Sequence, residues 1–371
     1  MDYKVRFVNY PKHYQNMKTE IDAAVTEILS HGDFILRSHL RDFEKNMADF
    51  LGVKYTIGVN NGTDAIFFSL LAAGVGKGDE VITPAHTFVA TIAGIVHCGA
   101  TPILIDIGDD MNMDVNQVEQ LITSKTKAIM PVHLNGRLCD MGKLMKIAEK
   151  HDLIVIEDAA QALGATHKGK MGGSFGLAGC FSFYPAKILG TAGDAGLVST
   201  NDKEFADQIF SLRDNGRIIG SDDINGFGYN SRLDNLHAAM LNVKFKYLHA
   251  WITRRREIAQ RYQEGLSDIP ELTLPPSPDA KGPFFDVFQN YVIRSKRRDE
   301  LAAFLRNSGV EIIISWPVPL NKQPKLGLQH FRLPVTEKVS NEVISLPLYP
   351  ELEDDQVEYV IDVLHDFHEK K

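Results

Sequence analysis

The sequence predicts an α/β fold in which a large domain, built on a mostly parallel central sheet wrapped by helices, precedes a smaller α+β domain. Between residues 53 and 200, short β-rich runs alternate with helical patterns, which is typical of a parallel sheet. Several of these runs are apolar on both faces, as strands covered by helices on two sides must be. Polar residues follow the runs at their carboxyl ends, where ligands bind in such sheets.

The strands of the large domain are predicted from seven runs that read as short β-strands. They are residues 55–60, 80–83, 101–105, 128–131, 153–156, 179–183 and 195–200. From residue 202 to 249 the pattern is helical, with a glycine-rich break at residues 225–232. We expect this break to be ordered by a contact with something else.

The smaller domain is predicted from the pattern beyond Trp251. Its expected elements are a long helix, a proline-rich connector at residues 275–283, a strand at 288–294, a helix at 298–308 and a strand at 310–315. We therefore divide the chain into a large cofactor-binding domain, residues 1–250, and a small domain, residues 251–371.

Composition limits the class of protein. The chain has 371 residues with a formal net charge of −8, which argues against nucleic-acid binding because such domains carry a basic excess. The only dense basic run, Arg254 to Arg256, is expected on a solvated helix face. No apolar run is long enough to span a membrane, and we expect no leader at the start of the chain. Three cysteines fit neither a disulfide framework nor a metal motif, so we expect a cytoplasmic protein without a metal.

A lysine and a carboxylate suggest the chemistry. Lys187 follows an aromatic, hydroxyl-bearing strand end and precedes a glycine-rich segment, residues 190–196. An amine held in a closed site loses its proton more readily than an exposed one and can attack a carbonyl. Asp158 ends a strongly apolar strand, where a protonated pyridine nitrogen would offset the burial of its charge. Without that partner, Asp158 would read as the cap of the next helix.

Further residues complete the needs of one cofactor, pyridoxal phosphate. Gln161 could hydrogen-bond the ring hydroxyl, and Phe88 could stack on the ring, although alone it would read as a core aromatic. Gly62 and Thr63 open a helix whose N–H groups could hold a phosphate, and a simple N-cap would look the same. This cofactor requires an amine, an anion that faces the pyridine nitrogen, hydrogen-bond donors for the phosphate and a flat side chain against the ring.

These motifs resemble those of the DegT/StrS-type sugar aminotransferases, which are pyridoxal phosphate enzymes of fold type I. The similarity covers nearly the whole chain, through residues 61–65, 83–88, 131–134, 157–161, 181–187, 228–232 and 346–352. The resemblance implies that Lys187 is the catalytic residue. The cofactor contacts that it implies are Gly62, Thr63, Phe88, Asp158, Gln161, Ser182, Lys187 and Asn230. Asn230 would reach the phosphate of a neighbouring subunit, so a homodimer is implied.

The reaction that the resemblance implies is a transamination in two halves. Glutamate gives its amine to the cofactor, and a keto- or aldehyde-sugar then takes it, which supplies an amino sugar for a surface polysaccharide or lipopolysaccharide. Lys187 moves the proton in both halves. Two alternatives stay open, a pyridoxal phosphate-dependent sugar dehydratase and a regulator that binds the cofactor without turnover. In the dehydratases a histidine replaces the lysine.

The sequence departs from many relatives where the sugar would bind. Residues 133–137 read His-Leu-Asn-Gly-Arg in place of His-Leu-Tyr-Gly, and residues 314–322 lack the usual histidine-rich stretch. A nucleotide-linked sugar is normally held there. The acceptor could instead be an acidic sugar such as an oxidised octulosonic acid. The candidate substrate contacts are His133, Arg137, Arg217, Arg232 and Lys322.

Overall fold

The computed structural model describes residues 3–369 and contains one large sheet and two small ones. The large sheet has the strand order β1-β9-β8-β5-β4-β2-β3. Its strands are β1 (Tyr55–Val59), β2 (Glu80–Pro84), β3 (Thr101–Ile105), β4 (Thr126–Ile129), β5 (Ile154–Asp158), β8 (Ala178–Ser182) and β9 (Gly196–Thr200). All seven predicted runs are therefore strands of one sheet.

The sheet is mostly parallel, as predicted. Strands β8, β5, β4, β2 and β3 pair in parallel, whereas β9 runs antiparallel to both β8 and β1. Because β9 alone is reversed, the carboxyl ends of the other strands meet at one edge. This edge is where the polar residues that follow the strands come together.

Helices cover both faces of the sheet, which explains the doubly apolar strands. The helices of this part are α2 (Ser38–Leu51), α3 (Gly62–Ala72), α4 (Val89–His97), α5 (Val118–Leu121), α6 (Met141–Lys150), α7 (Lys203–Arg213) and α8 (Asn235–Phe245). In β5, Ile156 packs in the cluster that includes α3 and α7, and its neighbour Val155 packs with α6 on the other face. In β8, Cys180 faces α3 and Phe181 faces α2. Successive side chains alternate between two buried layers.

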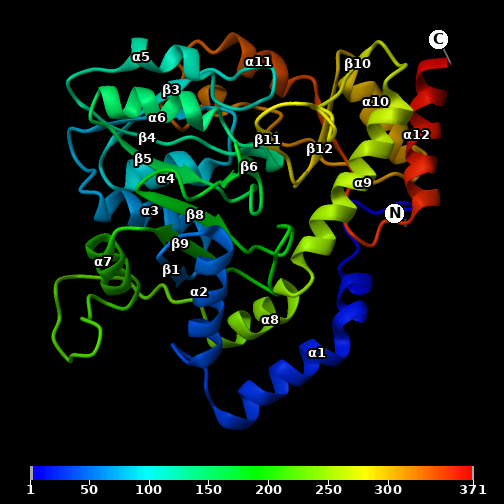
Figure 1. The fold of residues 1–371 in the computed structure, drawn as a ribbon. Coiled ribbons are helices and arrows are strands. Elements are labelled where there is room, and N and C mark those ends of the chain that lie inside the picture. The colour runs from blue at the N-terminus through cyan, green and yellow to red at the C-terminus, as the bar shows by residue number, and fades with distance from the viewer. Residues whose placement is uncertain (1–2, 370–371) are drawn as a thin grey trace.

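The smaller part is organised around the antiparallel sheet β10-β12-β13. Its elements are α9 (Leu248–Leu266), β10 (Leu272–Thr273), β12 (Tyr291–Ser295), α10 (Arg298–Asn307), α11 (Pro334–Ser340), β13 (Val343–Leu346) and α12 (Asp354–Glu369). Figure 1 shows this sheet with α10 and α12 on one side of the molecule and the large sheet on the other, and α9 rises from α8 into the smaller part. The α+β character agrees with the sequence analysis.

The division at residue 250 stays a prediction, and two features bear on it. Residue 250 falls inside α9, which begins at Leu248. Near the other end of the chain, Val5 is fully buried in the core of the smaller part, and it bridges to Val310. After this segment, α1 (Tyr10–His31) packs on α8, away from the small sheet. A division that follows the packing would place the first residues with the smaller part.

Some sequence-based expectations were wrong. Residues 310–315 form no strand, and only isolated bridges at Val310 and Ile313 pair this segment. A small sheet that was not predicted joins β11 (Phe284–Phe285), β6 (Thr166–His167) and β7 (Lys170–Met171). Arg255 does not lie on a solvated face, because it is 5% exposed and donates to the carbonyl of Leu348. It holds α9 to the chain segment after β13.

Candidate active site

A cavity of about 470 Å³ opens at the carboxyl edge of the large sheet. The predicted residues that line it are Gly62, Thr63, Phe88, His133, Asp158, Gln161, Ser182 and Lys187. They follow or end the strands β1, β2, β4, β5 and β8, so the fold brings together residues that are far apart in the sequence. The cavity is large enough for a small-molecule ligand.

Asp158, the last residue of β5, is 6% exposed. Its carboxylate accepts hydrogen bonds from Thr91 Oγ1 at 2.8 Å and from the N–H of Ala160 at 3.2 Å. Both donors are neutral. Burial raises the pKa of Asp158 above its ordinary value, and the hydrogen bonds and the nearby Lys187 oppose this shift only in part. The site therefore holds a desolvated carboxyl that a cation would stabilise.

Lys187 lies in the loop that follows β8, and its loop is held from the smaller part of the molecule. Gln289 accepts from the N–H of Ile188 at 2.9 Å and donates to the carbonyl of Ala186 at 2.8 Å. Burial lowers the pKa of Lys187, and the charge of Asp158 raises it by less. The amine therefore loses its proton more readily than a surface lysine does.

The start of α3 approaches the end of β8 closely. A Cβ at Gly62 would lie 2.9 Å from Ser182 Cβ, so only glycine fits there. Asn61 caps the helix by accepting from the N–H of Asp64 at 2.8 Å. The first N–H groups of α3, Thr63 and Ser182 therefore face the cavity together. A helix N-terminus of this kind favours an anion such as a phosphate.

Two more predicted residues have geometry suited to a planar ring. Phe88, at the start of α4, is 59% exposed on the cavity wall and can present a ring face to a ligand. Gln161 accepts from the N–H of Asn135 at 2.9 Å through its carbonyl oxygen. Its amide nitrogen is the part that a ligand can use.

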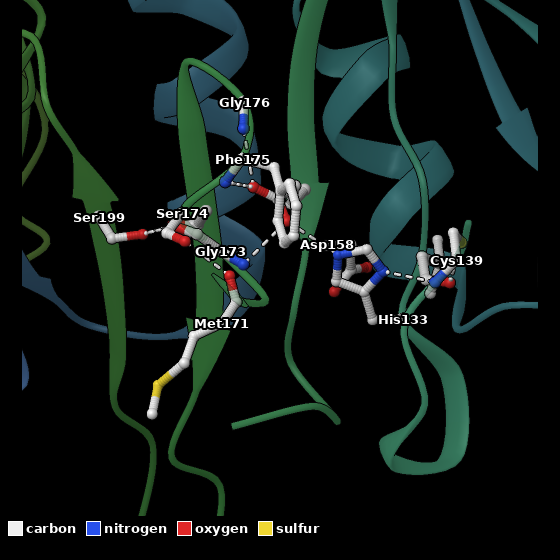
Figure 2. A network of polar contacts seen from close by, with 12 residues as sticks. His133, Cys139, Asp158, Met171, Gly173, Ser174, Phe175, Gly176 and Ser199 are labelled. Atoms are coloured by element: carbon white, nitrogen blue, oxygen red, sulfur yellow. Dashed lines mark hydrogen bonds and ion pairs between the residues drawn. The ribbon is translucent and has the colours of Figure 1, made fainter. Parts of the chain in front are cut away.

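His133 lines the cavity but has no exposed surface. Its Nε2 lies 2.9 Å from Glu157 Oε2, and its Nδ1 accepts from the N–H of Cys139 at 3.2 Å (Figure 2). Both ring nitrogens are thus committed inside the protein. The prediction that His133 binds substrate can hold only for the carbon edge of its ring.

The structure does not bring the four predicted basic residues to this cavity. Arg137 forms an ion pair with Asp286 at 2.7 Å, and Lys322 pairs with Glu337 at 2.9 Å. Arg232 pairs with Asp214 at 2.7 Å, and Arg217 lies on the same surface loop with an exposed side chain. Within one chain, none of the four lines the cavity wall.

Asn230 also lies outside the cavity of its own chain. It sits on the exposed loop between α7 and α8 and accepts from Arg232 Nη2 at 2.7 Å. Its predicted contact with a neighbouring subunit therefore stays a prediction.

The sequence analysis missed several residues of the site. Thr91 holds Asp158, Gln289 holds the lysine loop, and Trp316 and Tyr184 form part of the cavity wall. Gln289 and Trp316 belong to the part of the chain assigned to the small domain, and no local pattern marks them. The sequence could have indicated Thr91, since this residue lies in α4, four residues after Thr87.

Comparison with known proteins identifies the family. The model of the DegT/DnrJ/EryC1/StrS aminotransferase family matches residues 15–365. The chain belongs to this family. A pleiotropic regulatory protein of Geobacillus stearothermophilus is 41% identical and is matched over 98% of both chains. The dTDP-3-amino-3,4,6-trideoxy-alpha-D-glucose transaminase of Streptomyces venezuelae is 36% identical over 99% of this chain and 97% of its own.

Solved structures agree with this family in fold and cofactor. DesV of S. venezuelae, in complex with a ketimine intermediate, covers 98% of both chains with a TM-score of 0.94 and 36% identity. NtdA of Bacillus subtilis, with the bound cofactor PMP, covers 95% of this chain and 82% of its own with a TM-score of 0.89 and 32% identity. The protein is a fold type I, pyridoxal phosphate-dependent sugar aminotransferase.

Proposed function

We propose that this enzyme moves the amino group of glutamate to the C3 carbonyl of a nucleotide-linked keto-sugar. The product would be an amino sugar for a surface polysaccharide or lipopolysaccharide. The observation that carries the proposal is the meeting of Lys187 and Asp158 in one buried cavity. Burial lowers the pKa of Lys187 and raises that of Asp158, and both shifts favour the neutral side chain. The neutral amine can attack a carbonyl, and a nearby cation would ionise the carboxyl.

We assign the chemical work to Lys187 and Asp158. Bound here, pyridoxal phosphate supplies a carbonyl that condenses with amines and a ring that accepts electrons from the reacting carbon. Lys187 Nζ would bind the cofactor covalently and, once displaced, would carry the proton at the substrate carbon. Asp158 would hold the ring nitrogen in its protonated form, since its burial favours a cationic partner.

The other cavity residues would orient the cofactor. We assign Gly62, Thr63 and Ser182 to the phosphate, because they face the cavity at the start of α3. Phe88 would stack on the ring, and the amide of Gln161 would meet the ring hydroxyl. Together these contacts fix the plane of the ring against Lys187.

The position of the carbonyl is proposed from the relatives. The enzyme of S. venezuelae is named for a 3-amino dTDP-sugar, and one of Aneurinibacillus thermoaerophilus, 40% identical, for a 3-amino-3,6-dideoxy sugar. A Pseudomonas aeruginosa enzyme, 38% identical, is named for a 3-oxo UDP-glucuronate. These names share carbon 3 and a nucleotide, and the last adds a carboxylate. An acidic acceptor therefore stays a candidate, although no basic candidate residue lines the cavity of a single chain.

A second candidate function is a regulator that binds the cofactor without turnover. It is favoured by the names of two relatives, the G. stearothermophilus regulatory protein and the erythromycin biosynthesis sensory transduction protein EryC1 of Saccharopolyspora erythraea. Lys187 and Asp158 are both in place in this chain, so the groups required for turnover are present. Lys187 also disfavours the dehydratase alternative.

We also propose a homodimer in which Asn230 enters the cavity of the partner subunit. The loop that carries it exposes large apolar side chains at Ile219, Ile224 and Phe227, which a second chain would cover. Mixing a Lys187→Ala variant with an Asn230→Ala variant tests this assignment. If subunits exchange and Asn230 serves the partner's site, one site of each hybrid dimer has neither defect, and activity reappears. If Asn230 serves its own chain, no hybrid site exceeds the Asn230→Ala activity.

The cytoplasm is our proposed location. The free thiols of Cys98, Cys139 and Cys180 support a reducing compartment. Within residues 3–369, no helix has both the length and the apolar character that crossing a membrane requires.

The experiment that tests the proposed function is a visible absorption spectrum before and after glutamate is added without a sugar. We expect a band from the lysine-bound cofactor that disappears with glutamate and returns with a 3-keto nucleotide sugar. A panel of dTDP-, UDP- and GDP-linked 3- and 4-keto sugars, with an oxidised octulosonic acid, then identifies the acceptor. A band that no amino donor changes would favour the regulator.

A further inference from the structure

Glu157, next to Asp158 in β5, is a fully buried carboxylate with four hydrogen-bond donors. Its Oε1 accepts from the N–H groups of Phe175 at 2.7 Å and Gly176 at 2.9 Å. Its Oε2 accepts from the N–H of Gly173 at 2.8 Å and lies 2.9 Å from His133 Nε2. Backbone N–H groups can only donate, so the arrangement is matched to an ionised carboxylate.

The loop that supplies these donors is pressed against the sheet. A Cβ at Gly176 would lie 2.2 Å from the carbonyl oxygen of Val155, so no other residue allows the approach. Ser199 Oγ in β9 donates to the carbonyl of Gly173, which ties the other end of the loop. Figure 2 shows Gly173, Phe175 and Gly176 on one side and the ring of His133 on the other. The carboxylate of Glu157 has hydrogen-bond partners on both sides.

His133 has one possible protonation state in this arrangement. Its Nδ1 accepts from the N–H of Cys139, so that nitrogen carries a lone pair. The proton then lies on Nε2, which donates to Glu157. The ring is neutral and has no nitrogen left for a substrate. The backbone N–H of His133 donates to the backbone carbonyl of Asp158 at 2.9 Å, which ties the segment after β4 to the end of β5.

The charges around the cofactor end are therefore unequal. The titratable groups near Glu157 and His133 are Asp158, Cys139 and Cys180, and Lys187 faces Asp158. Burial raises the pKa of both thiols, with Glu157 contributing, so they stay neutral. Glu157 is then a fixed anion beside Asp158 and Lys187, whose burial favours their neutral forms. A bound cofactor that carries positive charge would restore the balance.

We propose that Glu157 is a positioning residue that keeps the ring of His133 neutral, with its proton on Nε2, in the wall of the cavity. The fixed negative charge of Glu157 also favours the positively charged form of the bound cofactor. This inference rests on the proposed roles of Asp158 and Lys187. It gives the segment Gly173 to Gly176 a function, that of a cradle for a buried anion.

The test is a pH titration of the visible absorbance of the holoenzyme in Glu157→Gln. Glutamine keeps the shape but removes the charge and turns one oxygen into a donor. We expect the titration midpoint to fall by about 0.5 pH unit or more, because a cationic form loses a nearby anion. Ser199→Ala is the matched control, since it loosens the same loop and leaves Glu157 and His133 intact. Its midpoint should equal that of the wild type.

Two results would overturn the proposal. One is a Glu157→Gln midpoint equal to that of the wild type, and the other is an equal shift in Ser199→Ala. A second measurement reads the state of the His133 ring directly, and its readout comes from the wild-type enzyme. Nitrogen-15 spectra of histidine-labelled holoenzyme, with the His133 signal assigned by its loss in His133→Gln, should show a ring with its proton on Nε2 and a lone pair on Nδ1. A His133 ring with its proton on Nδ1 contradicts the lock. Failure of the proposed function would be seen separately, as a wild-type band that does not respond to glutamate.

Discussion

The inner and outer ends of the cavity are built differently. At the inner end, Asp158 and the pair of Glu157 and His133 are buried, and hydrogen bonds from several elements hold each of them. At the mouth, Tyr184 is 52% exposed and Trp316 is partly exposed. The inner side chains are held by hydrogen bonds, whereas those at the mouth are open to a ligand.

This difference separates the chemistry from the choice of sugar. Residues at strand ends in one sheet define the cofactor end, and those strands have little freedom to move. The mouth is made by Tyr184 and by Trp316, which comes from the smaller part of the molecule. Substitutions at the inner end should therefore reduce both half-reactions, and those at the mouth should affect mainly the sugar.

The largest expected effect is that of Lys187→Ala. Loss of both the covalent link and the proton carrier should lower kcat by at least about 10⁴-fold with any acceptor. Steady-state assays with the saturating cofactor measure this loss, and circular dichroism checks the fold. Lys203→Ala, at an exposed ion pair on α7, is the control and should keep full activity. Substantial turnover in Lys187→Ala would sink the assignment of the base.

Asp158→Asn should lower kcat by about 10² to 10³-fold, because an amide cannot hold the ring nitrogen as a cation. The same change should make the cofactor-free protein more stable at pH 7. Burial raises the pKa of Asp158 in the folded state, so wild-type stability falls as pH rises from the ordinary pKa of aspartate to the raised one, and the loss is constant above it. The gain in stability from Asp158→Asn should vanish at pH values below the ordinary pKa of aspartate. Denaturant unfolding at several pH values measures it, and equal stabilities at pH 7 would contradict the desolvation argument.

Thr91→Val removes the hydroxyl that donates to Asp158 Oδ2 and keeps the shape of the side chain. A hydrogen bond to a charged group contributes about 1.5–3 kcal/mol, so the affinity for the cofactor should fall roughly 10- to 100-fold. Titration of the cofactor-free protein with pyridoxal phosphate gives the dissociation constant. Thr87→Val is the matched control, because Thr87 Oγ1 lies 2.8 Å from Thr91 Oγ1. It should weaken binding less than Thr91→Val does.

Trp316→Ala sharpens the comparison at the mouth. Its ring forms part of the cavity wall and packs edge-on against His86 with centroids 5.3 Å apart. We expect KM for the sugar to rise roughly 10-fold, as loss of stacking and packing area suggests, while KM for glutamate stays within about twofold. Trp316→Phe should recover most of the loss. Equal changes in both KM values would show that the mouth does not act on the sugar alone.

The smallest effect on activity is expected for Arg137→Gln. Its guanidinium pairs with Asp286 and Asp110 and lies 3.9 Å from the centroid of the Phe284 ring, away from the cavity. Activity should stay within about twofold of the wild type, whereas stability should fall by roughly 3 kcal/mol because Asp286 loses its partner. Unfolding curves and kinetics together test this. A large rise in KM for an acidic sugar would restore Arg137 as a substrate contact.

The same two ends mark the limit of what the sequence could predict. Strand ends carry local patterns, so Asp158, Lys187 and the start of α3 could be placed from the sequence and the family resemblance. Gln289 and Trp316 reach the cavity through packing between the two parts of the chain, which leaves no local pattern. Arg137 looked available in the sequence because its partner Asp286 is far along the chain. Charge pairing of that kind depends on the fold.

The most direct test of this account is to measure the two half-reactions separately in single turnovers of the wild type, Thr91→Val and Trp316→Ala. Cofactor absorbance follows the reaction with glutamate first and the return reaction with the acceptor sugar second. We predict that Thr91→Val slows both halves by similar factors, whereas Trp316→Ala slows only the sugar half. A Trp316→Ala enzyme that loses both halves equally would contradict the separation of chemistry from sugar choice.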